Sequence, residues 1–212
     1  MSTNREAIAF CLCGPVASGK TSISREVIKR VSGLRLSIST TTRLPRENET
    51  DGVQYFFVKP EEFERRVAAG MFIEHATVSG YHYGTEKVNR ELATKAGEDL
   101  LLDIDYQGAA ELNRLYRGSV VTIAIVPPSF AELRNRLTGR GDKDPAYIEA
   151  RLQLAKRELA ILLDPDFSDF LVVNDQLETS IDEVVTIVRS ERLRLSRSDH
   201  GVLATKLIES DS

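Results

Sequence analysis

Apolar residues along the chain are arranged in two patterns, and the alternation of these patterns predicts the fold. We expect strands at residues 7–13, 34–38, 55–58, 72–78, 100–104, 120–126 and 170–173. The runs at 100–104 and 120–126 are apolar except for Asp103 and Thr122, a pattern that is typical of strands that are covered on both faces. Helical patterns separate most of these strands, and this order favours a parallel sheet that is wrapped by helices.

Helix boundaries follow from glycine, proline and capping residues. Ser129 and Glu132 form a capping box for a helix that ends near Gly139. A helix from about Glu86 ends near Gly97, a suitable C′ residue. Further helices are expected from the glycine-rich turn to about residue 30, from residue 60, and at about residues 146–163 and 180–195. The polar residues 43–54 predict a loop.

Composition limits the class of protein. The 212 residues are 42% hydrophobic, which is enough for one core with a smaller lobe attached. The formal net charge of −4 disfavours a broad nucleic-acid surface. No apolar run approaches 18 residues, and the start of the chain lacks a signal-peptide core, so we expect no membrane association. Cys11 and Cys13 are interpreted as buried residues on one strand face in a reducing cytoplasm.

Residues 14–21 read GPVASGKT and match the phosphate-binding loop pattern G-x-x-x-x-G-K-[ST] between a predicted strand and a predicted helix. In such a loop the glycines let backbone N–H groups converge on phosphate oxygens. Lys20 then reaches the β- and γ-phosphates, and the Thr21 hydroxyl ligates Mg²⁺. The motif predicts a site for ATP with Mg²⁺, made by Gly14, Pro15, Val16, Ala17, Ser18, Gly19, Lys20, Thr21 and Ser22.

A second polar segment follows at residues 37–46, which read SISTTTRLPR. Arg43 and Arg46 offer planar donor groups that suit the oxygens of a phosphate. Read alone, the segment also fits a surface loop with solvated arginines.

The order of several blocks resembles the guanylate kinase family of ATP:GMP phosphotransferases over residues 10–195. These blocks are the phosphate-binding loop, STTTRLPR, GVQYFFV, FIEHATVSGYHYGT, LDIDYQG, RLTGRG, RL…A…E across 151–158, and VVND. The resemblance implies an α/β fold of the P-loop nucleoside monophosphate kinase type, with a parallel core sheet flanked by helices, a small GMP-binding lobe and a lid. It also implies transfer of the γ-phosphate of ATP to GMP, and to dGMP as a poorer acceptor.

The same resemblance implies the residues that hold GMP. In the family, two arginines and two tyrosines hold the phosphate, at the positions of Arg43, Arg46, Tyr55 and Tyr83. A glutamate and two hydroxyls read the guanine, at the positions of Glu74, Ser39 and Thr85, where serine is common in place of Thr85. A carboxylate accepts from both N1–H and the 2-amino group of guanine, whereas adenine presents an acceptor at N1 and leaves a buried carboxylate unpaired.

Asp103 and Asp105 end the predicted strand at 100–104, and their spacing predicts that both point to one face. The carboxyl ends of such strands border the ligand crevice. The resemblance implies a guanine nucleotide contact for Asp105. Asp103 is expected either to help hold Mg²⁺ through water or to make structural hydrogen bonds.

The resemblance places further cations around the transferred phosphate. Arg140 belongs to the lid and Arg151 to the following helix, and both join Lys20 and Arg43 as catalytic candidates. Asn174 would lie by the adenine of ATP, with Arg136 stacked nearby.

These expectations describe a single domain over residues 1–212, a monomer or a homodimer. Its core is expected at 5–38 and 98–197, the GMP-binding lobe at 39–97, the lid at 137–150 and a tail at 198–212. One alternative is a non-enzymatic module of the same fold that binds phosphorylated peptides; such modules typically have a degraded phosphate-binding loop. The other is a small-molecule kinase with a different acceptor, such as a phosphorylated sugar.

Overall fold

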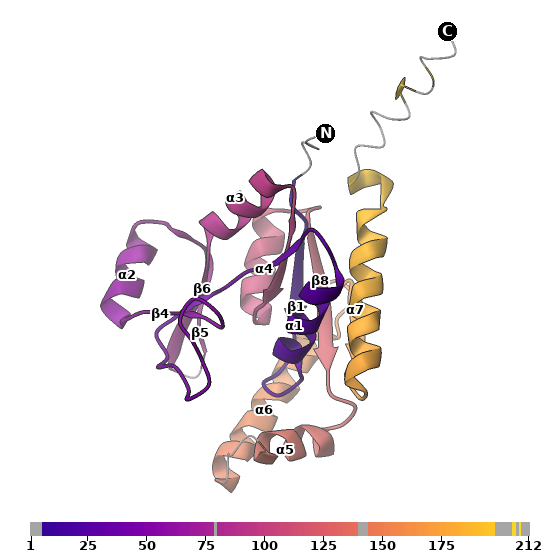
Figure 1. Cartoon of the computed structure of the whole chain (residues 1–212). Coiled ribbons are helices and arrows are strands. Elements are labelled where there is room, and N and C mark those ends of the chain that lie inside the picture. Colours follow the sequence, from indigo (N-terminus) through magenta and orange to yellow (C-terminus); the bar gives the residue numbers. More distant parts are fainter. Residues whose placement is uncertain (1–5, 79, 140–143, 198–204, 207, 209–212) are drawn as a thin grey trace.

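A five-stranded parallel sheet forms the centre of the computed structural model, which describes residues 6–78, 80–139, 144–197, 205, 206 and 208 (Figure 1). The strand order is β2-β7-β1-β8-β9, and every neighbouring pair is parallel. The strands are β1 (Ala9–Cys13), β2 (Leu34–Leu36), β7 (Asp99–Asp103), β8 (Val120–Val126) and β9 (Phe170–Val173). The predicted parallel sheet is therefore confirmed.

Helices cover both faces of this sheet. On one face, Phe10 and Leu12 of β1 pack in a cluster with residues of α1 (Lys20–Arg30) and α7 (Leu177–Arg192). On the other face, Cys11 and Cys13 lie in a cluster with residues of α3 (Lys87–Ala96), α4 (Tyr106–Leu115) and α6 (Pro145–Leu162). Both cysteines are fully buried on one face, as their spacing predicted. β1 is apolar throughout, and β8 is apolar except for Thr122, because neither face of these strands meets water.

A second sheet stands beside the first, on the left in Figure 1. Its order is β4-β3-β6-β5, with β4 (Phe56–Phe57), β3 (Thr40–Thr41), β6 (Tyr81–Glu86) and β5 (Phe72–Val78). Helix α2 (Pro60–Ala68) is anchored to it by Phe63, whose ring stacks on that of Phe72 at 4.6 Å between centroids. The register of β5 against β6 shifts between Phe72 and Glu74, so one extra residue is accommodated there.

A helix pair closes the lower end of the molecule in Figure 1. Leu133 and Leu137 of α5 (Phe130–Gly139) are buried together with Ile148 and Leu152 of α6. Ala17 of the glycine-rich turn belongs to the same cluster. The position of the phosphate-binding loop is therefore tied to α5 and α6 by apolar packing.

Most predicted element boundaries agree with the structure, and among its strands and α-helices three were not predicted. Strand ends agree within two residues, and α7 starts three residues before the expected position 180. The capping box is half formed, because the N–H of Glu132 donates to the Ser129 hydroxyl at 3.0 Å while the Glu132 carboxylate bonds to Arg136. The missed elements are β3, β6 and α4. Within the described ranges, no helix combines the length and apolar character needed to span a membrane.

Candidate active site

The glycine-rich turn between β1 and α1 has a backbone that tolerates no side chain at two positions. Gly19, the N-cap of α1, has φ 103°, and a Cβ there would lie 2.0 Å from the Nδ2 atom of Asn174. A Cβ on Gly14 would lie 2.1 Å from the backbone carbonyl oxygen of Ile125 in β8. Both contacts are far below van der Waals distance. The shape of the loop therefore depends on the close approach of the β8 backbone at Gly14 and of the Asn174 side chain at Gly19, and the loop lies at the positive end of a helix, where anions bind.

Lys20 and Thr21 lie beside the end of β7. The Lys20 Nζ atom donates to the carbonyl oxygens of Gly14 at 2.6 Å and Pro15 at 3.2 Å, and it lies 4.0 Å from Asp103. The Thr21 hydroxyl donates to Asp103 Oδ2 at 2.6 Å. A hydroxyl next to a carboxylate, both partly accessible, is a donor set that suits Mg²⁺, a hard cation that prefers oxygen ligands. Asp103 is thus brought to the phosphate-binding loop, as expected.

Asn174 and Arg136 meet behind the loop. The Asn174 Nδ2 atom donates to the carbonyl oxygen of Ser18 at 2.7 Å, and Arg136 donates to the carbonyl oxygen of Asn174 at 2.8 Å. Asn174 is 5% exposed. The pair that was expected near adenine is therefore together, and in this structure the Asn174 amide braces the loop. The Ser18 hydroxyl is buried and has no hydrogen-bond partner among the described residues.

Arg43 lies on the other side of the site, in the loop after β3. Its guanidinium pairs with both carboxylate oxygens of Glu49, at 2.9 Å each, and Glu49 also accepts the N–H of Arg46 at 2.8 Å. Although burial opposes it, this pairing lowers the pKa of Glu49 and raises that of Arg43. The Glu49 carboxylate therefore occupies an anion position formed by the Arg43 guanidinium and the backbone N–H of Arg46. The sequence analysis missed Glu49, and its only sequence signal is its place six residues after Arg43.

Aromatic rings surround this ion pair. The Arg43 guanidinium lies 5.5 Å from the ring centroid of Tyr55, and the rings of Tyr55 and Tyr83 meet edge to face at 5.8 Å. Burial, and next the charge of Asp103, raise the pKa of the Tyr55 hydroxyl. The charge of Asp103, whose carboxylate accepts from Thr21, therefore also acts on Tyr55. It links the two halves of the candidate site.

Glu74 is a buried acid on β5. It is 7% exposed, and burial raises its pKa to about 7, with a smaller contribution from the charge of Asp105. Thr85 of β6, its cross-strand partner, partly offsets this rise. The Thr85 hydroxyl is buried and does not meet hydrogen-bond geometry with any described residue. Ser39 is 8% exposed at the start of the same sheet. This group of buried polar atoms has unused hydrogen-bonding capacity, and such capacity is costly unless a ligand uses it.

Asp105 caps helix α4 and does not belong to β7, which ends at Asp103. Its Oδ1 accepts the N–H of Gly108 at 2.9 Å, and its Oδ2 accepts from Gln107 Nε2 at 3.0 Å. The expectation that Asp103 and Asp105 project from one strand face is therefore corrected. Asp103 turns to the phosphate-binding loop, whereas Asp105 belongs to the helix that lies against β5 and contributes to the pKa of Glu74.

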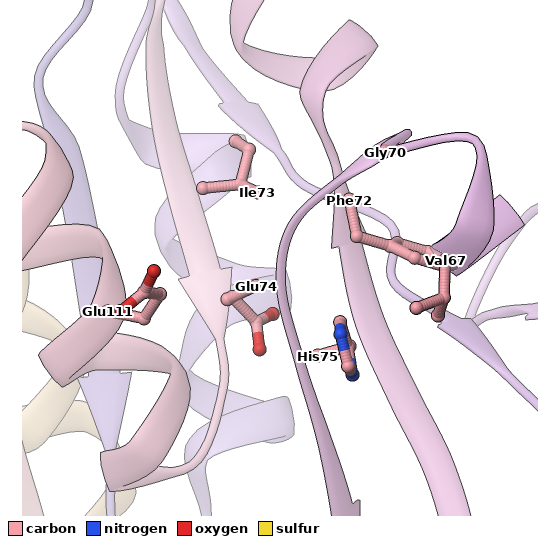
Figure 2. A pocket seen from close by; sticks show the side chains of 7 residues that line it. All are labelled: Val67, Gly70, Phe72, Ile73, Glu74, His75 and Glu111. Carbon is pink, nitrogen blue, oxygen red and sulfur yellow. The ribbon is translucent and has the colours of Figure 1, made fainter.

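An open cavity of about 340 Å³ lies along β5, between α2 and α4. Figure 2 shows that Glu74 and His75 project to opposite sides of the strand, with Glu111 of α4 on the Glu74 side. Neither arginine of the loop after β3 lines it. The cavity therefore meets the candidate site only at Glu74.

Arg151 and Arg140 are the remaining predicted cations of the site. Arg151 of α6 donates to the Tyr147 hydroxyl at 2.8 Å and lies over that ring. Arg140 and the centre of the expected lid lie outside the described residues. Glu158 of α6, to which no role was assigned, is half-buried; burial raises its pKa, and the nearby charges of Lys20 and Arg151 oppose that rise. Its sequence signal was the glutamate of the RL…A…E block.

Comparison with known proteins gives concordant results. The family model described as guanylate kinase matches residues 7–191. A guanylate kinase of Thermotoga maritima is 43% identical over 198 residues, covering 93% of this chain and 94% of that protein. One from Syntrophotalea carbinolica is 44% identical over 193 residues, covering 91% and 90%. The crystal structure of guanylate kinase from Anaplasma phagocytophilum superposes with a TM-score of 0.78 at 31% identity, covering 98% of this chain and 96% of that chain.

Proposed function

This chain belongs to the guanylate kinase family, and we propose that it transfers the γ-phosphate of ATP to GMP, releasing ADP and GDP. An oxygen of the GMP phosphate attacks the γ-phosphorus in line. The bond between that phosphorus and the β,γ-bridging oxygen breaks, and the electron pair leaves with ADP. No covalent intermediate with the protein is needed. We expect dGMP to be a poorer acceptor and the reaction to take place in the cytoplasm.

The donor side of the proposed reaction is the loop of residues 14–21 with its supports. Its backbone N–H groups would surround the phosphates of ATP, and Lys20 would leave the Gly14 and Pro15 carbonyls to reach the transferred group. Thr21 and Asp103 would hold Mg²⁺, Thr21 directly and Asp103 through water. Bound there, Mg²⁺ neutralises charge on the phosphate oxygens. Ser22, Arg136 and Asn174 would complete the nucleotide site.

The acceptor side would hold GMP by its phosphate and by its base. Arg43, Arg46, Tyr55 and Tyr83 are proposed to bind the phosphate, with Arg43 exchanging Glu49 for the new anion. Glu74 would accept from N1–H and the 2-amino group of guanine, and the Thr85 or Ser39 hydroxyl would donate to O6. Asp105 would add a further acceptor. Arg140 and Arg151 are proposed to contact the transferred phosphate.

One observation carries this proposal, namely the burial of the Glu74 carboxylate beside the buried hydroxyl of Thr85. A carboxylate that is 7% exposed has lost most of its hydration, and hydrogen bonds from a ligand compensate for that loss. Guanine brings two adjacent donors and one acceptor, which match a carboxylate and a hydroxyl. Adenine presents an acceptor where guanine presents N1–H, so it leaves the carboxylate unpaired.

An ADP-release assay on the purified chain with ATP and Mg²⁺ tests the proposal. The acceptors are GMP, AMP, UMP, CMP and a phosphorylated sugar, each with and without a chelator of divalent cations. GMP should exceed every other acceptor by at least about 100-fold in kcat/KM, and the chelator should abolish transfer. Equal rates with a second acceptor, or ADP release that does not depend on GMP, would refute the proposed function.

A further inference from the structure

Gly108 lies in the first turn of α4, within the site already described, yet no role has been given to it. It is buried, three residues after the N-cap Asp105. Its N–H donates to Asp105 Oδ1 at 2.9 Å. Glycine is a poor helix residue, because it loses more backbone freedom on folding than any other residue. Its presence inside a helix therefore calls for a local reason.

The reason is the position of the Glu74 carboxylate. A Cβ on Gly108 would lie 2.7 Å from Glu74 Oε2 and 2.9 Å from its Cδ, closer than Cβ atoms approach other heavy atoms in proteins. The carboxylate thus occupies the space that any other side chain at 108 would fill. Figure 2 shows the Glu74 side chain on the side of β5 that faces Glu111, three residues after Gly108 on α4.

We propose that Gly108 is a positioning residue for guanine selection, since its N–H orients Asp105 and its lack of a side chain gives Glu74 its place. This inference rests on the proposed function. The two donors of guanine require an acceptor at a defined distance and angle, and hydrogen bonds weaken steeply when either changes. Glu74 is 7% exposed, so a carboxylate displaced by a side chain at 108 has little room to regain the same geometry.

We expect a side chain at position 108 to weaken the recognition of guanine and to leave folding unchanged. The atoms that a Cβ at 108 would meet are the end of a flexible side chain, and they move at low cost, whereas the helix backbone stays in place. Alanine also favours the helix more than glycine does. The donor loop is a separate structural element, so the binding of ATP should not change.

The test compares Gly108→Ala with the wild-type protein and with Ala110→Ser, which adds one heavy atom at an exposed position of the same helix. Gly108→Ala should raise KM for GMP about 10- to 100-fold, the range for losing a hydrogen bond to a charged group. KM for ATP and the melting temperature should stay near wild-type values. The double variant Gly108→Ala with Glu74→Asp, whose carboxylate is one methylene shorter, should bind GMP better than Gly108→Ala alone.

The outcomes separate this inference from the proposed function. A wild-type protein that does not phosphorylate GMP refutes the proposed function. A wild-type protein that does so, with an unchanged KM for GMP in Gly108→Ala, refutes only the role of Gly108. An equal rise in KM for GMP and for ATP also contradicts it. If Gly108→Ala fails to fold, Glu74→Ala in the same chain should restore folding by removing the clash, and failure to do so overturns the inference.

Discussion

The two halves of the candidate site are built by different means. The donor half, residues 14–21, is a backbone structure whose shape depends on glycines that leave no space for a side chain. The acceptor half is made of side chains: Arg43 forms an ion pair with Glu49, and Glu74 is buried. In the donor half we expect Lys20 to change hydrogen-bond partners when the ligand arrives while the loop backbone keeps its shape, whereas in the acceptor half the ligand must replace a side-chain partner of Arg43.

Two glycines make this difference concrete. A Cβ on Gly14 would meet a backbone carbonyl of the central strand β8, and a Cβ on Gly108 would meet the end of the Glu74 side chain. A backbone group in a central strand cannot move without the sheet, but a carboxylate can. Damage to the donor half should therefore be severe and structural, and damage to the acceptor half should be graded and specific to the ligand.

The largest expected effect follows from Gly14→Ala. The new Cβ at 2.1 Å from the Ile125 carbonyl oxygen forces the loop away from β8. Several phosphate-binding N–H groups are then misplaced, and kcat/KM should fall by about 1000-fold, the upper range for losing preorganised donors. Binding of GMP, measured by calorimetry without ATP, should remain. Turnover near the wild-type rate would contradict the account of a backbone-built donor half.

Glu74→Gln should abolish selection between bases with little effect on the donor half. The amide presents one acceptor and one donor where guanine offers two donors, so the preference for GMP over AMP should fall about 100-fold. Glu111→Gln is the matched control, because Glu111 lines the same cavity. If the ratio of kcat/KM for the two acceptors is unchanged in Glu74→Gln, guanine is read elsewhere.

An effect of intermediate size is expected from pH, which should change the affinity of the acceptor half for GMP through the ionisation of Glu74. The pKa of Glu74 is raised to about 7 by burial, so the free protein holds a proton there below that pH and releases it above. Guanine, with its two donors, binds the ionised form, and GMP affinity should therefore fall about tenfold between pH 8 and pH 6. Titration calorimetry in Glu74→Gln corrects for ionisation of the GMP phosphate itself. An equally steep profile in that variant would assign the dependence to another group.

The smallest effect is expected from Glu49→Gln. Loss of the carboxylate frees Arg43 from a partner that the GMP phosphate must replace, so GMP affinity should rise about threefold, a modest change because partly accessible ion pairs contribute little. Glu47→Gln, at an exposed position of the same loop, should leave the affinity unchanged. A weaker affinity in Glu49→Gln would mean that Glu49 holds the loop in its binding shape.

The sequence predicted the donor half in more detail than the acceptor half, because the donor half is a backbone loop and the acceptor half is made of side chains from several segments. A backbone loop leaves a local motif, GPVASGKT, and buried parallel strands leave mainly apolar runs such as Val120–Val126, in which only Thr122 is polar. Strand β3 has only two residues, and β6 reads YHYGTE without clear alternation, so neither was expected. The ion pair of Glu49 with Arg43 depends on the conformation of an irregular loop, and the contact of Gly108 with Glu74 joins two distant segments, so no local pattern predicts either contact.

The bond from the Asn174 amide to the Ser18 carbonyl spans 156 residues. During synthesis from the N-terminus, residues 14–21 are therefore made long before Asn174, whose amide supports their loop. Domains fold as units during synthesis. An N-terminal fragment that ends before β9 contains the whole GPVASGKT motif but lacks the Asn174 hydrogen bond that supports the loop. We therefore expect the proposed triphosphate site to be complete only after Asn174 has left the ribosome.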